Sequence, residues 1–148
     1  MHLVIDASVA VKWIVNEPLS DAASKLLDQG YSLIAPDLMY LEAANALWAM
    51  SRRGDISHAD LAQAVDTLLL APVEIPSASR DLLPAAARLA ADLAHPIYDC
   101  CYLALGMRER ARVVTADERF LAAVRKQHHL AQEIVFLGDV LTLEKPES

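Results

Sequence analysis

The stretch that decides the fold is Leu3-Val4-Ile5-Asp6-Ala7-Ser8. Its three leading apolar residues have the length of a short buried strand, and residues 8–15 have a helical pattern. An acid therefore stands at the carboxyl end of a strand, just before a helix. In open parallel α/β sheets the ligand crevice lies at this end of the strands. The stretch thus predicts both a fold class and the position of a site.

The same alternation of apolar strand-length runs and longer helical patterns continues along the chain. Further strands are expected at residues 32–35, 73–75, 112–115 and 134–136, and further helices at residues 19–29, 37–53, 57–70, 80–93, 99–110 and 117–128. Residues 37–70 contain no strand, so we expect a helical hairpin there, with Asp37 as the cap of its first helix and Ser57 as the cap of its second. The pattern predicts a single-domain, three-layer α/β/α fold over residues 1–148, with a parallel sheet of about five short strands and helices on both faces.

The overall composition limits the class of protein. A chain of 148 residues suits one domain with one core, and a hydrophobic fraction of 55% suggests that some apolar surface covers a subunit interface. No apolar run is long enough to span a bilayer, and Asp6 interrupts the first one. We therefore expect a cytoplasmic protein with no signal peptide and no membrane contact. The net charge of −7 argues against broad RNA affinity but allows a local phosphate-binding patch, for which the candidates are Lys12, Arg52, Arg53, Arg108 and Arg119.

Three acids are expected at one edge of the sheet. Asp6 and Asp117 each follow a predicted strand, and Asp99 stands where a helix is expected to begin. Strand ends and helix starts share this edge of a parallel sheet, so the three side chains should converge. Each acid has an ordinary alternative, because Asp is a favoured residue at helix N-caps. Capping is the simpler interpretation for any one of them, and their combination favours a site.

Glu42 differs from the other acids because it lies inside a predicted helix and can cap nothing. Asn45 lies beside it, and its apolar neighbours at helical spacing are Leu38, Met39, Ala46 and Ala49. A carboxylate on an apolar helical face needs a cation, a hydrogen-bond donor or a raised pKa. The two interpretations are a role at a bound cation and a structural salt bridge to an arginine.

Several carboxylates in contact repel one another unless a cation lies between them. Mg²⁺ and Mn²⁺ prefer oxygen ligands, activate water and stabilise the charge on a phosphate. The sequence contains no glycine-rich phosphate loop, no Gly-x-Ser-x-Gly turn and no zinc-type spacing of histidines. Ser8 and Thr115 each have two interpretations, a helix cap or a hydrogen bond at the edge of the cation site. A divalent cation is therefore the expected cofactor.

Four segments, taken in order, resemble those of a known family. The segments are Val4–Ser8, Glu42–Leu47, Tyr98–Leu105 and Thr115–Phe120. Their order and spacing are similar to those of the PIN-domain family, and specifically of the VapC-type toxin ribonucleases of toxin–antitoxin pairs. The resemblance covers nearly the whole chain. Cys100-Cys101 departs from the family's small residues such as alanine, but cysteine is close in size and leaves the pocket undisturbed.

The resemblance implies a Mg²⁺- or Mn²⁺-dependent endoribonuclease that hydrolyses RNA phosphodiester bonds. The catalytic and metal-binding pocket that it implies consists of Asp6, Glu42, Asp99 and Asp117. The supporting polar groups that it implies are Ser8, Asn45 and Thr115. Glu42 is either a metal ligand or the base that positions the attacking water. The resemblance also implies a homodimer and inhibition by a cognate VapB-type antitoxin.

Two other functions stay open from the residues alone. A PIN-like interaction module without nuclease activity would share the fold, although the presence of all four acids argues against a lost metal site. A phosphoacceptor receiver domain also uses acids at parallel strand ends, but Asp6 has no adjacent acid. RNA cleavage separates the nuclease from the interaction module, and phosphorylation by a small phosphodonor would identify a receiver.

Overall fold

The computed structural model describes residues 1–142, and residues 143–148 of the predicted domain lie outside the described part. The strands are β1 (His2–Ile5), β2 (Ser32–Ile34), β3 (Arg112–Thr115) and β4 (Ile134–Phe136). The helices are α1 (Ala7–Ile14), α2 (Ser20–Leu26), α3 (Leu38–Arg52), α4 (His58–Leu69), α5 (Ser79–Leu93), α6 (Ile97–Glu109) and α7 (Glu118–Arg125). Two 3₁₀ segments, η1 (His128–Glu133) and η2 (Leu137–Thr142), flank β4. Within these residues, no helix combines the length and the apolar character needed to cross a bilayer.

The strands form one parallel sheet in the order β2-β1-β3-β4. Strand β1 is central, because Val4 pairs with Ile34 of β2 on one side and with Val113 of β3 on the other. Leu3, Val4 and Ile5 have no exposed surface. Successive strand residues point to opposite faces, so this complete burial means that both faces of the sheet are covered. The predicted α/β class, with a parallel sheet and helices on both faces, is confirmed.

The predicted fifth strand, around Glu74, is reduced to a single bridge beside β2. The Glu74 amide donates to Leu33 O at 2.9 Å, and Glu74 O accepts from Ala35 N at 3.0 Å. Pro72 and Pro76 flank this segment. Proline has no amide hydrogen to donate and restricts the residue before it, so the ladder cannot extend in either direction. The sheet in the described part therefore has four strands instead of five.

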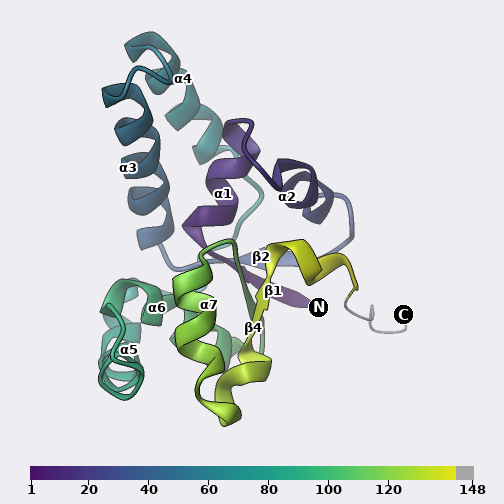
Figure 1. The fold of residues 1–148 in the computed structure, drawn as a ribbon, viewed down its shortest axis with the longest axis vertical. Helices are drawn as coiled ribbons and strands as arrows, with labels where there is room; N and C mark the ends of the chain where they lie inside the picture. Colours follow the sequence, from purple (N-terminus) through teal and green to yellow (C-terminus); the bar gives the residue numbers. More distant parts are fainter. Residues whose placement is uncertain (143–148) are drawn as a thin grey trace.

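The helices form close to where the sequence predicts them, and α3 packs on α4 as the expected hairpin, which projects at the top of Figure 1. Ser57 caps α4, because its Oγ accepts a hydrogen bond from Asp60 N. The predicted capping of α3 by Asp37 is wrong. Asp37 Oδ1 instead accepts a hydrogen bond from Ser79 N at 3.0 Å and so satisfies an amide at the start of α5. This contact ties the hairpin to the α5–α6 pair below it in Figure 1.

Helix α6 lies in the core and packs against β1 and β3. Every residue from Cys100 to Gly106 is buried, and both cysteines are free, as expected for small core residues. Gly106 permits a close approach, because a Cβ at this position would lie 2.6 Å from Ala111 O. Since α6 leads directly into the start of β3, its own first turn lies beside the carboxyl end of the sheet. The first turn contains Asp99.

Candidate functional site

The carboxyl-terminal edge of the sheet brings the predicted acids together. Asp6 follows β1, and Asp117 stands just beyond β3, the neighbouring strand. Burial raises the pKa of Asp6, and the nearby carboxylates of Asp99 and Glu42 raise it further. Burial likewise raises the pKa of Asp99, and the nearby Asp117 carboxylate raises it further. Such mutual effects require charges within a few ångströms of one another. The acids therefore form one cluster, with contributions from β1, α3, α6 and the start of α7.

Asp6 is the most deeply buried of these acids, with 5% of its surface exposed. It occupies the N-cap position of α1, but its side chain caps nothing. Instead, Asp6 Oδ2 accepts hydrogen bonds from Thr115 Oγ1 at 2.5 Å and from Ser8 Oγ at 3.1 Å. Both hydroxyls are themselves held, because they accept from the amides of Ala116 and Asp117, each at 3.0 Å. Burial raises the pKa of Asp6 to about 7, and the Thr115 hydrogen bond opposes part of that rise. Ser8 and Thr115, predicted as supporting groups, thus contact Asp6 directly.

Asp99 lies in the first turn of α6 and does not cap that helix. Its Oδ2 lies 2.6 Å from Nε2 of His95, in the short connection between α5 and α6. The His95 ring stacks on Phe120 of α7, with 5.4 Å between the ring centroids. Burial raises the pKa of Asp99, and the hydrogen bond from His95 acts in the opposite direction. The carboxylate is therefore anchored by a side chain from outside its own helix.

Glu42 has a tyrosine as its partner, not the arginine that a structural salt bridge would need. The fully buried Tyr102 of α6 donates its hydroxyl to Glu42 Oε1 at 2.7 Å. Burial raises the pKa of Glu42, the Tyr102 hydrogen bond opposes the rise, and the Asp99 carboxylate adds to it. Burial and the nearby carboxylates raise the pKa of Tyr102, so its hydroxyl keeps its proton and remains a donor. Helix α6 thus carries one of the acids and the partner of another.

Asp117 is the acid for which the capping interpretation is correct. Its Oδ1 accepts hydrogen bonds from Arg119 N at 2.9 Å and Phe120 N at 3.3 Å, at the start of α7. These contacts satisfy amides that a helix leaves free at its first turn. The cap fixes the carboxylate beside Asp99 and leaves its other oxygen available.

All four carboxylates share one arrangement: hydrogen bonds from the described residues engage one oxygen of each and leave the other free. The engaged atoms are Asp6 Oδ2, Glu42 Oε1, Asp99 Oδ2 and Asp117 Oδ1. The free oxygens reach solvent, because within residues 1–142 Ser77 Oγ is the one side-chain polar atom that is both fully buried and unpaired. No Lys or Arg side chain of these residues forms an ion pair with any of the four acids.

This donor set fits a hard divalent cation in its chemistry, since it offers carboxylate oxygens that neighbouring donors orient. In the part of the chain that the structure describes, no group of three His, Cys, Asp or Glu side chains is already arranged to hold one metal ion. An ion could therefore be held here only if the free oxygens moved closer together. Crowded, buried carboxylates with raised pKa values gain from such an ion, because it removes both their repulsion and part of the desolvation cost.

Three other residues differ from the sequence-based expectations. Asn45, predicted as a supporting group, is exposed on α3 and makes no side-chain hydrogen bond to the acids within residues 1–142. His95 and Tyr102 were not predicted, yet they contact Asp99 and Glu42. Tyr102 follows Asp99 by three residues, which places both on one face of a helix, so helical spacing could have revealed it.

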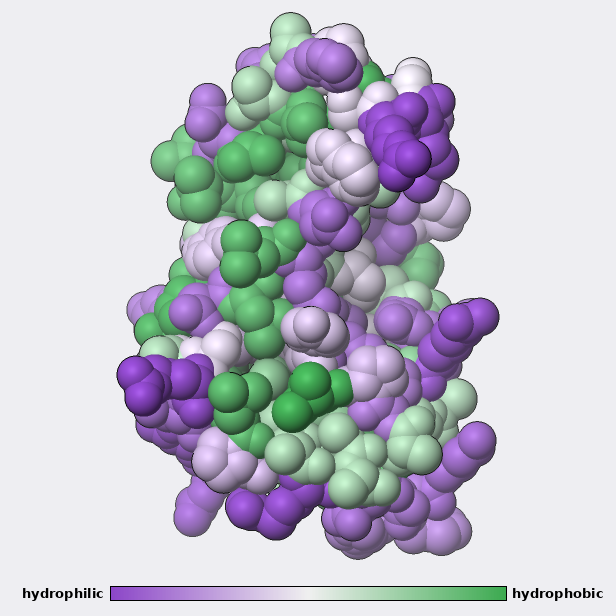
Figure 2. Space-filling model, turned by 90° about the vertical axis from the view of Figure 1, so that its left-hand side faces the viewer, coloured by the Kyte–Doolittle hydropathy of each residue, from purple (hydrophilic) through white to green (hydrophobic). Residues whose placement is uncertain are grey.

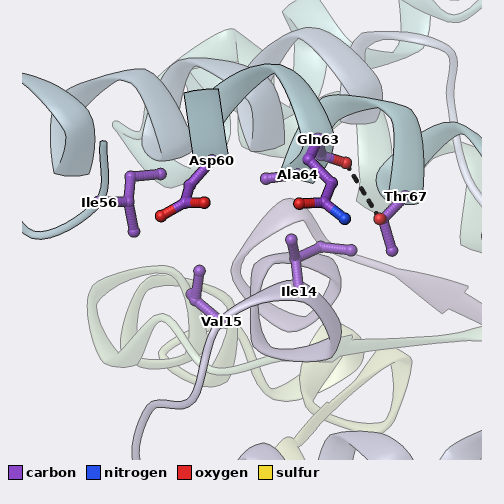
Figure 3. Close-up of a pocket in the computed structure, with 7 residues that line it drawn as sticks. All are labelled: Ile14, Val15, Ile56, Asp60, Gln63, Ala64 and Thr67. Carbon is purple, nitrogen blue, oxygen red and sulfur yellow. Dashed lines mark hydrogen bonds between the residues drawn. The ribbon is translucent and has the colours of Figure 1, made fainter. Parts of the chain in front are cut away.

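Two surface hollows of the described residues lie away from the acids. Figure 3 shows one of about 270 Å³ between α1 and α4, where Asp60 and Gln63 face Ile14 and Val15. A larger hollow of about 500 Å³ lies between α5, α6 and η1, with Arg88 on its rim. None of the four acids lines either hollow. The acidic cluster is therefore a feature of the sheet edge and distinct from these hollows.

The fold and the acidic edge together define a class of protein. The sequence profile of the PIN-domain family matches residues 3–126, and the chain belongs to this family. The resemblance of this chain to the VapC type is confirmed by a relative, Ribonuclease VapC3 from Pyrobaculum aerophilum. The two sequences are 30% identical over 130 residues, and the match covers 84% of this chain and 98% of the relative.

Two solved structures have a similar fold. PAE2754 from Pyrobaculum aerophilum has a TM-score of 0.68 at 20% identity, with coverage of 96% of this chain and 93% of its own. A toxin–antitoxin complex from Klebsiella pneumoniae contains a chain with a TM-score of 0.59 at 11% identity, with coverage of 91% of this chain and 97% of its own. At these identities the likeness establishes the fold.

Proposed function

We propose that this protein is the toxin of a toxin–antitoxin pair, an endoribonuclease that uses Mg²⁺ or Mn²⁺ held by Asp6, Glu42, Asp99 and Asp117. The observation that carries the proposal is the shared arrangement of these carboxylates, each anchored through one oxygen and free at the other. Membership of the PIN-domain family and the relative described as a ribonuclease support RNA as the substrate.

The side chains at the site have separate roles in the proposed reaction. When bound, the cation supplies charge neutralisation at the phosphate and lowers the pKa of a water molecule. Asp6, Asp99 and Asp117 would hold it through their free oxygens, while Ser8 and Thr115 keep Asp6 in one orientation. Glu42 is either a further ligand or the base that takes the proton from the attacking water, a role that its raised pKa favours.

Arg119 is the best placed of the predicted phosphate contacts. It is exposed, lies in the first turn of α7 and follows Asp117 by two residues. The other candidates already have partners: Lys12, Arg53 and Arg108 lie in ion pairs with nearby acids, and Arg52 lies over the ring of Trp48. Because the chain has a net charge of −7, we expect RNA binding to depend on a few local contacts of this kind.

The proposal includes two protein partners, a second copy of the chain and an antitoxin. Figure 2 shows hydrophobic side chains gathered along the face that α3, α5 and α6 form. All three helices carry exposed apolar residues, among them Leu41 of α3 at 75% exposure and Tyr98 of α6 at 64%. Apolar patches of this kind commonly mark protein interfaces. The toxin–antitoxin complex of similar fold supports an antitoxin as the other partner.

Sedimentation velocity tests the homodimer. The wild type should sediment as a dimer, and Leu41→Glu should sediment as a monomer. A monomeric wild type would contradict the proposed homodimer.

The enzymatic proposal is tested by incubating the purified protein with a structured RNA and Mg²⁺ or Mn²⁺. Cleavage should occur with the wild type and stop with chelator or with Asp99→Asn. The matched control is Asp66→Asn, which removes an exposed acid of α4 outside the site and should leave cleavage intact. Cleavage that survives both chelator and Asp99→Asn would overturn the mechanism. A folded wild type that cleaves no RNA would favour the interaction module.

A further inference from the structure

His95 lies in a connection whose backbone is fixed from both sides. Ala94 closes α5 in the left-handed region with φ of 50°, and His95 N donates to Ala90 O at 3.2 Å. Pro96 follows as the N-cap of α6, and its ring restricts φ. The His95 side chain therefore leaves the backbone at a rigid corner between two packed helices.

The imidazole ring is held as firmly as the backbone. It stacks on Phe120 with the two ring planes 16° from parallel, and 12% of the His95 side chain is exposed. Phe120 has no exposed surface, and its amide donates to Asp117 Oδ1 at 3.3 Å. One ring thus connects Asp99 on α6 with the start of α7, where Asp117 lies.

This placement bears on how Asp99 presents its oxygens. An aspartate side chain can rotate about its two torsions, but the 2.6 Å contact with His95 Nε2 engages Oδ2 and leaves Oδ1 free. Groups that donate to a metal-binding carboxylate orient it, and their loss typically lowers metal affinity or activity about 10- to 100-fold. We propose that His95 is a positioning residue that fixes the Asp99 carboxylate for cation binding, an inference that rests on the proposed function.

The test compares two substitutions that separate packing from hydrogen bonding. His95→Phe keeps a ring that can stack on Phe120 but removes the N–H donor. His95→Gln places an amide N–H near the position of Nε2 and so restores the donor without the ring. The affinity for Mn²⁺ is measured without RNA, from the electron paramagnetic resonance signal of the free ion. We expect His95→Phe to weaken binding about 10- to 100-fold and His95→Gln to bind close to the wild type.

Several outcomes would overturn the inference. If His95→Phe binds Mn²⁺ as the wild type does, the hydrogen bond to Asp99 is not needed for cation binding. If His95→Gln binds as weakly as His95→Phe, restoring the donor does not rescue binding, and positioning through this hydrogen bond is ruled out. If His95→Phe fails to fold, His95→Asn replaces it, because its shorter amide stops short of Asp99. A folded wild type that binds no Mn²⁺ would overturn the proposed function and this inference with it. If the wild type binds Mn²⁺ and His95→Phe binds it equally well, this inference alone is overturned.

Discussion

Replacing Asp6 by asparagine should stabilise the cation-free protein at alkaline pH. The pKa of Asp6 is about 7 in the folded protein, against 3.8 for an ordinary aspartate, chiefly because the side chain is buried. The folded state therefore binds this proton more tightly than the unfolded chain does. The resulting stabilisation is complete below pH 3.8 and is lost as the pH rises through 7. Asparagine keeps an oxygen that can accept from Thr115 and Ser8, and it carries no charge at any pH.

The magnitude follows from the pKa difference. A rise from 3.8 to about 7 corresponds to about 4 kcal/mol of destabilisation once Asp6 is ionised. We therefore expect Asp6→Asn to raise the free energy of unfolding by up to about 4 kcal/mol at about pH 8, equivalent to roughly 10 °C in Tm. The gain should shrink towards pH 4, where the folded wild type is already protonated at this position.

The assay is urea denaturation of the wild type and Asp6→Asn in chelator, at a series of pH values. Asp66→Asn serves as the control, because it removes one negative charge from an exposed position and should show no comparable pH dependence. A variant that is less stable than the wild type at alkaline pH would refute the reasoning. So would a stability difference that stays constant with pH, since it would mean that ionisation of Asp6 costs nothing in the folded state.

Three further predictions concern the ion, the partner of Glu42 and the RNA. Mn²⁺ at about 100 times its Kd should stabilise the wild type by about 2.7 kcal/mol and Asp6→Asn by much less, as measured by thermal unfolding. An equal shift in both proteins would mean that the ion binds elsewhere. Tyr102→Phe should lower the free energy of unfolding by about 1–2 kcal/mol at neutral pH, because Glu42 loses its buried donor; unchanged urea denaturation would contradict this. Arg119→Ala should raise KM for RNA with little change in kcat, and a fall in kcat at constant KM would exclude a simple phosphate contact.

The sequence predicts the strands and helices better than it predicts how their side chains pair. Residues 3–5 and 112–115 are correctly predicted as strands because each is a short apolar run beside a turn. The segment around Glu74 is wrongly predicted as a strand. Its apolar pattern is typical of a strand, but the flanking prolines limit it to a single bridge. Asp37 is adjacent to α3 in sequence, yet it pairs with Ser79, and such a long-range contact leaves no local signal.

The acids themselves could be predicted, but their partners could not. The sequence predicts Asp6 and Asp117 at one edge because parallel strands end there, and it predicts a functional role for Glu42 because an acid on an apolar helical face needs a partner. The identity of that partner, Tyr102, depends on where the fold places α6 relative to α3, which no local pattern specifies. His95 lies just beyond the helix predicted at residues 80–93, and its contact with Asp99 depends on the corner between α5 and α6.

The central claim is that the free oxygens of the acidic edge bind a divalent cation. The most direct measurement is an anomalous-difference map from crystals grown with Mn²⁺. We predict a peak at the carboxyl end of β1 and β3, within about 2.5 Å of free carboxylate oxygens that include those of Asp6 and Asp99. An ordered edge without a peak, or a peak bound elsewhere with these carboxylates unchanged, would contradict the account.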